Sequence, residues 1–145
     1  MAKASETEVL IATIKACHWH PGIAWAERRH TGGYVVRGRL VEAKEAIGNS
    51  DVLGQMKTGE ALEIEVKKPG EWPDKEKLDA WEALPHSKRT AYQHRLVMQR
   101  KKLRRCWENN GYAGVIESVD EVQLVAGPCR VPLRLHLPEP DGVPF

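Results

Sequence analysis

The chain has 145 residues, of which 41% are hydrophobic and 29% charged, and its formal net charge at pH 7 is +2. This length suits one domain with a modest core, and the composition is that of a soluble globular protein rather than a disordered chain. Because no apolar run approaches the roughly 20 residues of a membrane span and the N-terminus lacks the apolar core of a signal peptide, we expect no membrane segment and a cytoplasmic location.

Residues 5–17 are predicted to form a helix. Ser5 is followed three residues later by Glu8, which is the spacing of a capping box at a helix N-terminus. Apolar residues then recur at helical intervals through Ile14 to Cys17, so one side of the helix is expected to pack on a core. Glu8 also has a simple structural interpretation, because acidic residues in a first turn interact favourably with the helix dipole.

Two strands are predicted after this helix. In the first, residues 23–28, the apolar Ile23 and Trp25 are expected on one face. The second covers residues 34–41. Residues 42–47 are polar with a weak apolar face, which predicts a short helix or a loop.

A β-hairpin is predicted within residues 48–70, whose sequence is GNSDVLGQMKTGEALEIEVKKPG. The first strand ends near Met56, and the turn at 57–59 contains a glycine. The second strand, residues 61–66, alternates apolar and charged side chains. Strict alternation beside a glycine-bearing turn is typical of a hairpin with one buried face.

Three charged residues of this hairpin are expected to meet. Glu65 and Lys67 lie on one face of their strand because side chains alternate with a period of two. Pairing back across the turn brings Asp51 near Glu65. Two carboxylates beside a lysine are able to hold a divalent cation and to orient a water or a phosphate. A solvated charged face explains the same pattern.

Two helices are predicted after the hairpin. Residues 74–83 form the first, with Asp74 as its cap. Residues 86–109 form a second, longer helix that is capped by Ser87 or Thr90 and ends at an Asn-Asn-Gly sequence.

The domain is predicted to comprise residues 1–126. A third core strand covers residues 113–119, and Asp120 is expected to cap a short final helix. The remaining residues, 127–145, form a proline-rich C-terminal extension. Within it, residues 131–137 alternate apolar and basic side chains, which is compatible with an edge strand.

Basic residues cluster at positions 28–30, 37–39 and 100–105. Such clusters either follow the phosphates of a nucleic acid or are solvated faces of helices and strands. There is no GxGxxG and no GxxxxGK[ST] motif, so we expect no nucleotide cofactor. The three cysteines form no CxxC pair, which argues against a structural zinc site.

The order of charged residues in the hairpin resembles a nuclease signature. Asp51 followed by Glu65-Val66-Lys67 has the D…ExK order of the PD-(D/E)xK nucleases, and SDVLG followed by LEIEVKKPG is similar to the VRR-NUC family within that superfamily. The resemblance covers roughly residues 5–125. It implies an α/β fold with a restriction-endonuclease-like core, in which α-helices flank a mixed central β-sheet in the order helix-strand-strand-strand-helix-strand.

The resemblance also implies a site for Mg²⁺ or Mn²⁺. Asp51 and Glu65 would supply carboxylates to the metal, and the main-chain carbonyl of Val66 would supply a third oxygen. Lys67 would polarise the attacking water or stabilise the charged phosphorus centre.

Two further site residues are implied by the family pattern, each with an alternative. A glutamate of the N-terminal helix, which would complete the metal site, is expected to be Glu8, with Glu6 held open. A glutamine on the long helix, about three turns before the GYAGV segment, is expected to be Gln99, with Gln93 as the alternative. It would orient the lysine or the scissile phosphate. In the strand that follows, Glu117 stands where the family usually has an arginine.

The implied function is that of a metal-dependent DNA endonuclease. Stand-alone members of this size are typical of phages and are similar in role to Holliday-junction resolvases, so branched DNA is the expected substrate and a homodimer the expected assembly, in a bacterial or phage-infected cell. The alternatives are a flap or nicking nuclease of replication or repair, and a non-catalytic DNA-binding module with the same fold. The intact trio of Asp51, Glu65 and Lys67 favours an enzyme.

Overall fold

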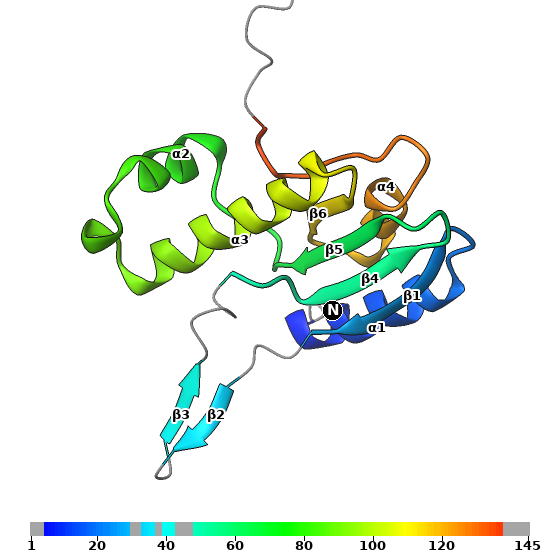
Figure 1. Cartoon of the computed structure of the whole chain (residues 1–145), viewed down its shortest axis with the longest axis horizontal. Coiled ribbons are helices and arrows are strands. Elements are labelled where there is room, and N and C mark those ends of the chain that lie inside the picture. The colour runs from blue at the N-terminus through cyan, green and yellow to red at the C-terminus, as the bar shows by residue number, and fades with distance from the viewer. Residues whose placement is uncertain (1–4, 30–32, 37–38, 43–47, 138–145) are drawn as a thin grey trace, which may run out of the picture.

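The computed structural model of the chain describes residues 5–29, 33–36, 39–42 and 48–137 (Figure 1). Its main sheet consists of β1 (Ile23–Arg28), β4 (Val52–Met56), β5 (Ala61–Val66) and β6 (Tyr112–Ile116). These strands lie in the order β1-β4-β5-β6. The first three are antiparallel neighbours, and β6 runs parallel to β5. The expected α/β class with a mixed central sheet is therefore confirmed.

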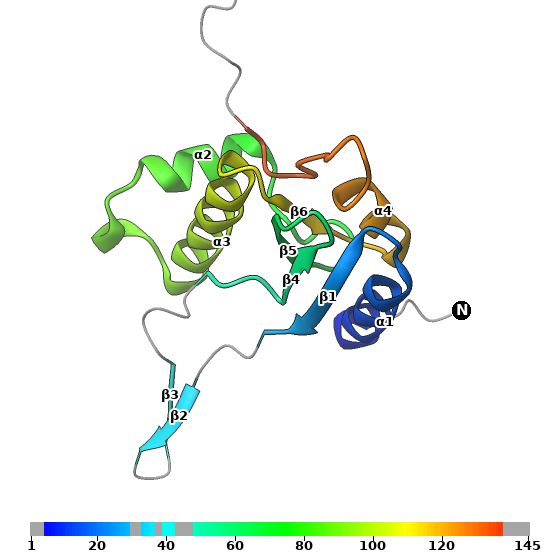
Figure 2. The same ribbon diagram turned by 45° about the vertical axis from the view of Figure 1, so that its right-hand side comes forward.

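Helices cover both faces of this sheet. α1 (Glu6–Trp19) lies on one face, and α3 (Ala91–Glu108) lies on the other, within the connection from β5 to β6 (Figures 1 and 2). The other helical elements are α2 (Lys75–Ala83), η2 (His86–Lys88), η3 (Val119–Glu121) and α4 (Val122–Val125). Within the described ranges, no helix combines the length and the apolar composition that a membrane span requires.

Two apolar clusters, one on each side of the sheet, form the core. On β5, the side chains of Leu62, Ile64 and Val66 are fully buried in the cluster that includes residues of α1. On β6, Ala113 and Val115 belong to the cluster that includes leucines of α3. Because side chains alternate along a strand, the charged residues of β5 face α3. This places Glu65 in the interior rather than on the surface.

Local signals in the sequence account for several element boundaries. Ser5 caps α1 and forms the predicted box with Glu8, since each residue's backbone N–H donates to the other's side chain, at 3.0 and 3.1 Å. Asp74 caps α2 by accepting the N–H of Lys77 at 2.9 Å. The predicted hairpin is present as β4 and β5.

The single strand predicted over residues 34–41 is wrong. The structure has two strands there, β2 (Gly33–Val36) and β3 (Arg39–Glu42), which pair with each other in a separate antiparallel sheet (Figures 1 and 2). The glycine at position 38 was the signal for this break, because glycine inside an apolar run often interrupts a strand. Residues 43–47, part of the predicted short helix or loop, lie outside the described residues.

Trp25 does not lie on the buried face of β1 with Ile23. The pairing register with β4 shifts between these two residues, and Ala26, which is 4% exposed, takes the inward position. The Trp25 side chain is 43% exposed, and its indole N–H donates to the Gln55 side chain at 3.0 Å. Such an irregularity changes the phase of the alternation by one residue, which the apolar pattern alone does not reveal.

The long helix begins later than residue 86. Residues His86–Lys88 form the separate turn η2, and Thr90 rather than Ser87 caps α3. The N–H of Gln93 donates to the Thr90 hydroxyl at 3.1 Å, and the N–H of Thr90 donates to the Gln93 side chain at 3.0 Å. Thr90 and Gln93 have the spacing of a capping box, whereas Ser87 has no glutamate or glutamine three residues later.

Two expectations for the chain after β6 are also wrong. Asp120 does not cap the final helix, because it lies within the short turn η3, whose N-cap is Ser118, and α4 follows with Glu121 at its N-cap position. Residues 131–137 form no strand but follow an irregular path. Leu135 in this segment is fully buried in the cluster beside α3. Part of the proline-rich extension therefore packs on the domain.

A buried arginine holds α2 against α3. Arg100 is 0% exposed; it donates to Asp79 at 2.8 Å and lies 3.2 Å from Glu82. Arg104, one turn further along α3, binds the same glutamate. In the basic run that begins at residue 100, Arg100 and Arg104 therefore belong to an ion-pair network with α2, whereas Lys101 and Arg105 are exposed.

Replacing Arg100 by alanine is expected to lower the free energy of unfolding by about 2 kcal/mol, because α2 loses its ion pairs and its contact with the arginine stem. Asp79 and Glu82 are 43% and 27% exposed, so water rehydrates them and limits the loss. Urea unfolding measures the change. Lys101→Ala, at the exposed neighbouring position, is the control and is expected within about 0.5 kcal/mol of wild type; equal losses in both variants would contradict this role of Arg100.

Candidate active site

The start of β4 and the end of β5 bring two carboxylates together. Val52 pairs with Ile64 across the two strands, so Asp51 lies next to Glu65, as the hairpin predicted. The Asp51 Oδ2 accepts a hydrogen bond from the Val66 N–H at 2.8 Å. This bond fixes the Asp51 carboxylate at the end of β5.

Glu65 is a buried carboxylate with only one satisfied oxygen. Its side chain is 2% exposed. Oε1 accepts a hydrogen bond from the Gln99 Nε2 at 3.0 Å and lies 3.3 Å from the Lys67 Nζ. Oε2 is buried and has no hydrogen-bond partner in the part of the chain that the structure describes. Such an atom in a native protein calls for an explanation, and a bound cation is one.

The pKa values of Glu65 and Glu6 in this cluster are raised by burial and by neighbouring negative charges. Burial raises the pKa of Glu65 well above its usual value; the charge of Asp51 and a side-chain hydrogen bond with Asp51 raise it further, and Lys67 acts in the opposite direction. The pKa of a third acid, Glu6, is raised by burial and by the charges of Glu71 and Asp51. A cation placed among these acids would stabilise their charged forms.

The two glutamates of the first turn of α1 lie in different surroundings. Glu6 lines a cavity of about 380 Å³ together with Asp51 and Lys68. Glu8 is exposed, and its carboxylate accepts the N–H of Ser5 at 3.0 Å in the capping box. The structure therefore places Glu6 beside the other acids and Glu8 at the helix cap.

The two candidate glutamines are separated in the same way. Gln99 is 6% exposed, and its amide faces Glu65 from α3. Gln93 lies at the N-terminus of α3, where its side chain accepts the N–H of Thr90. Of the two, only Gln99 contacts the acid cluster.

Gly48 sets how closely the chain that leads to Asp51 approaches α3. Its φ is +82°, and a Cβ at this position would lie 2.6 Å from the carbonyl carbon of Met98 and 2.9 Å from the nitrogen of Gln99. The next residue, Asn49, accepts a hydrogen bond from Lys102 of α3 at 3.0 Å. The glycine thus allows Asp51 and Gln99 to reach the same carboxylate.

The donor atoms of the site fit a hard divalent cation in part. Asp51 and Glu65 offer adjacent carboxylates, and one buried oxygen of Glu65 lacks a partner among the described residues. Across the described ranges, no three His, Cys, Asp or Glu side chains converge as a complete ligand group. A cation held here would need its remaining ligands from main-chain oxygens, water or substrate, as is common for Mg²⁺.

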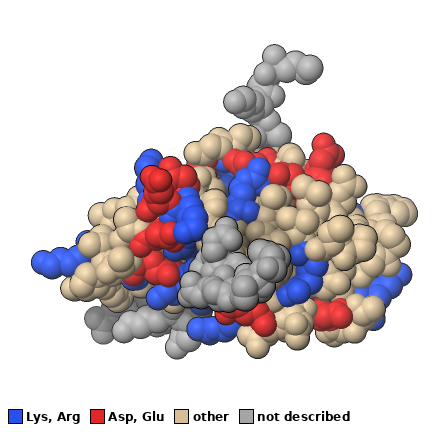
Figure 3. Space-filling model, turned by 90° about the horizontal axis from the view of Figure 1, so that it is seen from above, with Lys and Arg blue, Asp and Glu red and all other residues tan. Residues whose placement is uncertain are grey.

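Several basic side chains near the site are paired with acids. Arg29 lies 3.1 Å from Glu63, and Arg134 lies 2.7 Å from Glu117. Figure 3 shows Lys and Arg intermixed with Asp and Glu on the face that it displays. The side chains at positions 37–39 lie outside the described part of the chain. On the displayed face, the Lys and Arg side chains do not form one continuous basic surface.

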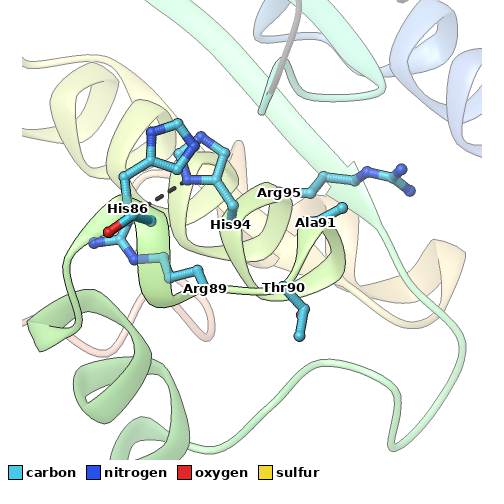
Figure 4. A pocket seen from close by; sticks show the side chains of 7 residues that line it. His86, Arg89, Thr90, Ala91, His94 and Arg95 are labelled. Atoms are coloured by element: carbon cyan, nitrogen blue, oxygen red, sulfur yellow. Dashed lines mark hydrogen bonds between the residues drawn. The ribbon is translucent and has the colours of Figure 1, made fainter.

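A separate cavity of about 720 Å³ lies at the N-terminus of α3 (Figure 4). His86 and His94 stack there with their ring centres 3.8 Å apart. Arg89 is held by the main chain, because its Nε donates to the Trp81 carbonyl oxygen at 2.8 Å. None of the residues that line this cavity belongs to the acid cluster, so the two features are distinct.

No protein-family model matches the chain, and no curated protein or solved structure matches it at a significant level. The comparisons therefore supply no relative, and the resemblance of the hairpin to the VRR-NUC family stays a prediction.

Replacing Gly48 by alanine is expected to destabilise the protein by about 2 kcal/mol more than the same change at Gly59, because only the first introduces a clash with α3. Both glycines have positive φ, +82° and +104°, but nothing lies within 4 Å of a Cβ at Gly59. The pair therefore separates steric overlap from backbone strain. Urea unfolding of both variants is the measurement, and equal losses would show that the approach to α3 is not tight.

In the metal-free protein, Glu65→Gln is expected to be stabilising, and increasingly so as the pH rises. The folded state raises the pKa of Glu65 above its ordinary 4.5, so this acid favours folding below pH 4.5 and loses that contribution as the pH rises through its folded pKa. Glutamine does not titrate.

Urea unfolding of both proteins from about pH 4 to about pH 8 tests this expectation. Glu108→Gln, at an exposed position of α3, controls for the general loss of one negative charge. A stability difference that stays constant or shrinks with pH would contradict the expected effect of burial.

Proposed function

We propose that the chain is a metal-dependent nuclease that hydrolyses phosphodiester bonds in DNA. The observation that carries the proposal is the buried carboxylate of Glu65, with one oxygen held by Lys67 and Gln99 and the other unpartnered among the described residues. A purely structural buried ion pair is expected to satisfy both oxygens, because an unmet buried oxygen destabilises the fold. A site for a cation and a phosphate would explain why the second oxygen of Glu65 has no hydrogen-bond partner among the described residues.

Mg²⁺ or Mn²⁺ fits these oxygen donors best. Asp51 and Glu65 would hold the ion, with the main-chain carbonyl of Val66 as the third oxygen that the resemblance implies. When bound, such an ion lowers the pKa of water and neutralises charge on the phosphate.

The remaining residues of the cluster have roles that follow from their contacts. Gln99 donates to the Glu65 Oε1 and so fixes the orientation of that carboxylate. Lys67, which is 8% exposed, brings a positive charge to the place where the phosphoryl oxygens gain negative charge during hydrolysis. Its low exposure strengthens this interaction, because little water is present to screen it.

We assign the N-terminal acid of the site to Glu6 rather than to Glu8. The pKa of Glu6 responds to Asp51 and Lys67, whereas the carboxylate of Glu8 is engaged by the backbone of Ser5. Glu6 is therefore the acid that would complete the outer coordination of the ion or bind attacking water.

The element order of the main sheet supports the family resemblance. When the separate β2–β3 sheet and the helical segments α2 and η2 are set aside, α1, β1, β4, β5, α3 and β6 follow the order helix-strand-strand-strand-helix-strand, which is the order implied for a restriction-endonuclease-like core. The narrower proposal, a VRR-NUC-type enzyme that cuts branched DNA as a homodimer, rests on the resemblance, since paired cuts in a symmetric junction require two active sites.

Cleavage of labelled DNA tests the proposal. Four-way junction, flap, single-stranded and fully paired DNA are incubated with Mg²⁺ or Mn²⁺ and the wild-type chain, Glu65→Gln or Lys67→Ala. Each variant is expected to lower kcat by about 100-fold or more, because each removes a charge that stabilises the transition state.

Glu63→Gln is the matched control. Glu63 lies two residues earlier on the same face of β5 but pairs with Arg29, so its loss is expected to leave kcat within about threefold of wild type. Equal losses at positions 63 and 65 would contradict the assigned site. If the chain binds DNA but shows no metal-dependent cleavage, the proposal of an enzyme is wrong and a DNA-binding module is the better interpretation.

A further inference from the structure

A cavity of about 410 Å³ opens beside the acid cluster. α1 contributes Glu6 and Val9 to it, the segment after β5 contributes Lys67 and Pro69, and the segment after β6 contributes Glu117 and Val119. It therefore lies beyond the C-terminal ends of two parallel strands, where α/β sheets commonly bind ligands. Because Lys67 and Glu6 form part of its wall, a group in this cavity lies directly beside the proposed reaction centre.

The walls of this cavity combine apolar surface with the charged side chains of Glu6, Lys67, Lys68 and Glu117. Val9, Pro69 and Val119 supply apolar surface. The charge of Glu117 is neutralised, because its carboxylate lies 2.7 Å from the Arg134 guanidinium and accepts the Gly70 N–H at 2.6 Å. The cavity thus combines apolar sides with a hydrogen-bonding polar edge, which is the character of a nucleobase site.

A second cavity, of about 380 Å³, adjoins the same centre and has a different character. Arg28 and Lys68 bring positive charge to it, beside Asp51 and Glu6. Glu6 and Lys68 belong to both cavities. The second cavity therefore offers basic side chains that a phosphate can contact, and the first cavity offers apolar walls against which a ring can pack. A nucleotide carries both groups, a few ångströms apart.

We propose that the cavity bounded by Val9, Pro69 and Val119 receives the base of the nucleotide next to the scissile phosphate, and that the chain cuts DNA at unpaired nucleotides. This inference rests on the proposed nuclease function. A base inside a paired duplex is stacked and cannot enter a protein cavity without being extruded. Single strands, flaps and the unpaired positions of branched DNA present such a base at no cost in pairing energy.

The test combines a change in the protein with a change in the DNA. Val119→Trp fills the cavity, while Leu124→Trp, at a position that is 43% exposed on α4, adds the same side chain elsewhere. Each protein is assayed with Mg²⁺ on a single-stranded oligonucleotide with a mapped cut, and on versions with an abasic site on either side of that cut. Melting temperatures verify that the variants are folded.

For the wild-type chain and for Leu124→Trp, one abasic position is expected to lower kcat/KM by about tenfold, the effect of losing one base contact. Val119→Trp is expected to cut the intact oligonucleotide about tenfold more slowly and to lose nothing further with the abasic version, because the base and the cavity form one interaction.

Three results would overturn the inference while leaving the nuclease function intact. The first is that the wild-type chain cuts abasic and intact DNA at the same rate. The second is that Val119→Trp loses as much kcat/KM on abasic DNA as the wild-type chain does. The third is that the wild-type chain cuts paired and unpaired DNA at equal rates while Glu65→Gln abolishes both activities. The first and third results need only the wild-type cavity, so they decide the matter even when Val119→Trp fails to fold. If wild type cuts no substrate, this inference and the proposed function both fall.

Discussion

A glutamate in the interior, 2% exposed and next to a second carboxylate, is the constraint that the rest of this structure accommodates. Taking a carboxylate out of water costs several kcal/mol unless other groups replace its hydration. At Glu65 the replacement comes from two directions, since Lys67 follows it on the same strand and Gln99 reaches it from α3. The replacement is incomplete at one oxygen, and this deficit gives the site its affinity for a cation in our proposal.

The position of α3 decides whether these groups meet. Consecutive residues of a helix point about 100° apart, so Gln99 faces the sheet while Arg100 faces α2. The ion pairs of Arg100 therefore hold α3 on the side that faces α2, while the Gln99 amide lies on the side that faces the sheet. Gly48 permits the chain before β4 to lie against the backbone of Met98 and Gln99. The segment between β5 and β6 is thus a support for the site and not only a connection.

Much of the fold could be predicted because it follows from interactions between near neighbours in the chain. The capping residues Ser5 and Asp74 act within three residues, and the β4–β5 hairpin depends on a short turn and on alternation. The encounter of Asp51 with Glu65 is also local in this sense, since the hairpin register determines it. The same rule decides between the two predicted caps of α3, because Gln93 completes a capping box with Thr90.

Other features depended on contacts between distant parts of the chain. The spacing from Ser5 predicted that Glu8 takes part in the capping box, but only the packing of α1 shows that Glu6 lies beside Asp51. The burial of Arg100 required the acids of α2, and the exposure of Trp25 followed from a register shift against β4. The sequence by itself therefore determined which chemical groups the hairpin offers. The tertiary structure decided which of the remaining acids and amides lie beside Asp51 and Glu65, because burial and long-range packing set their positions and charges.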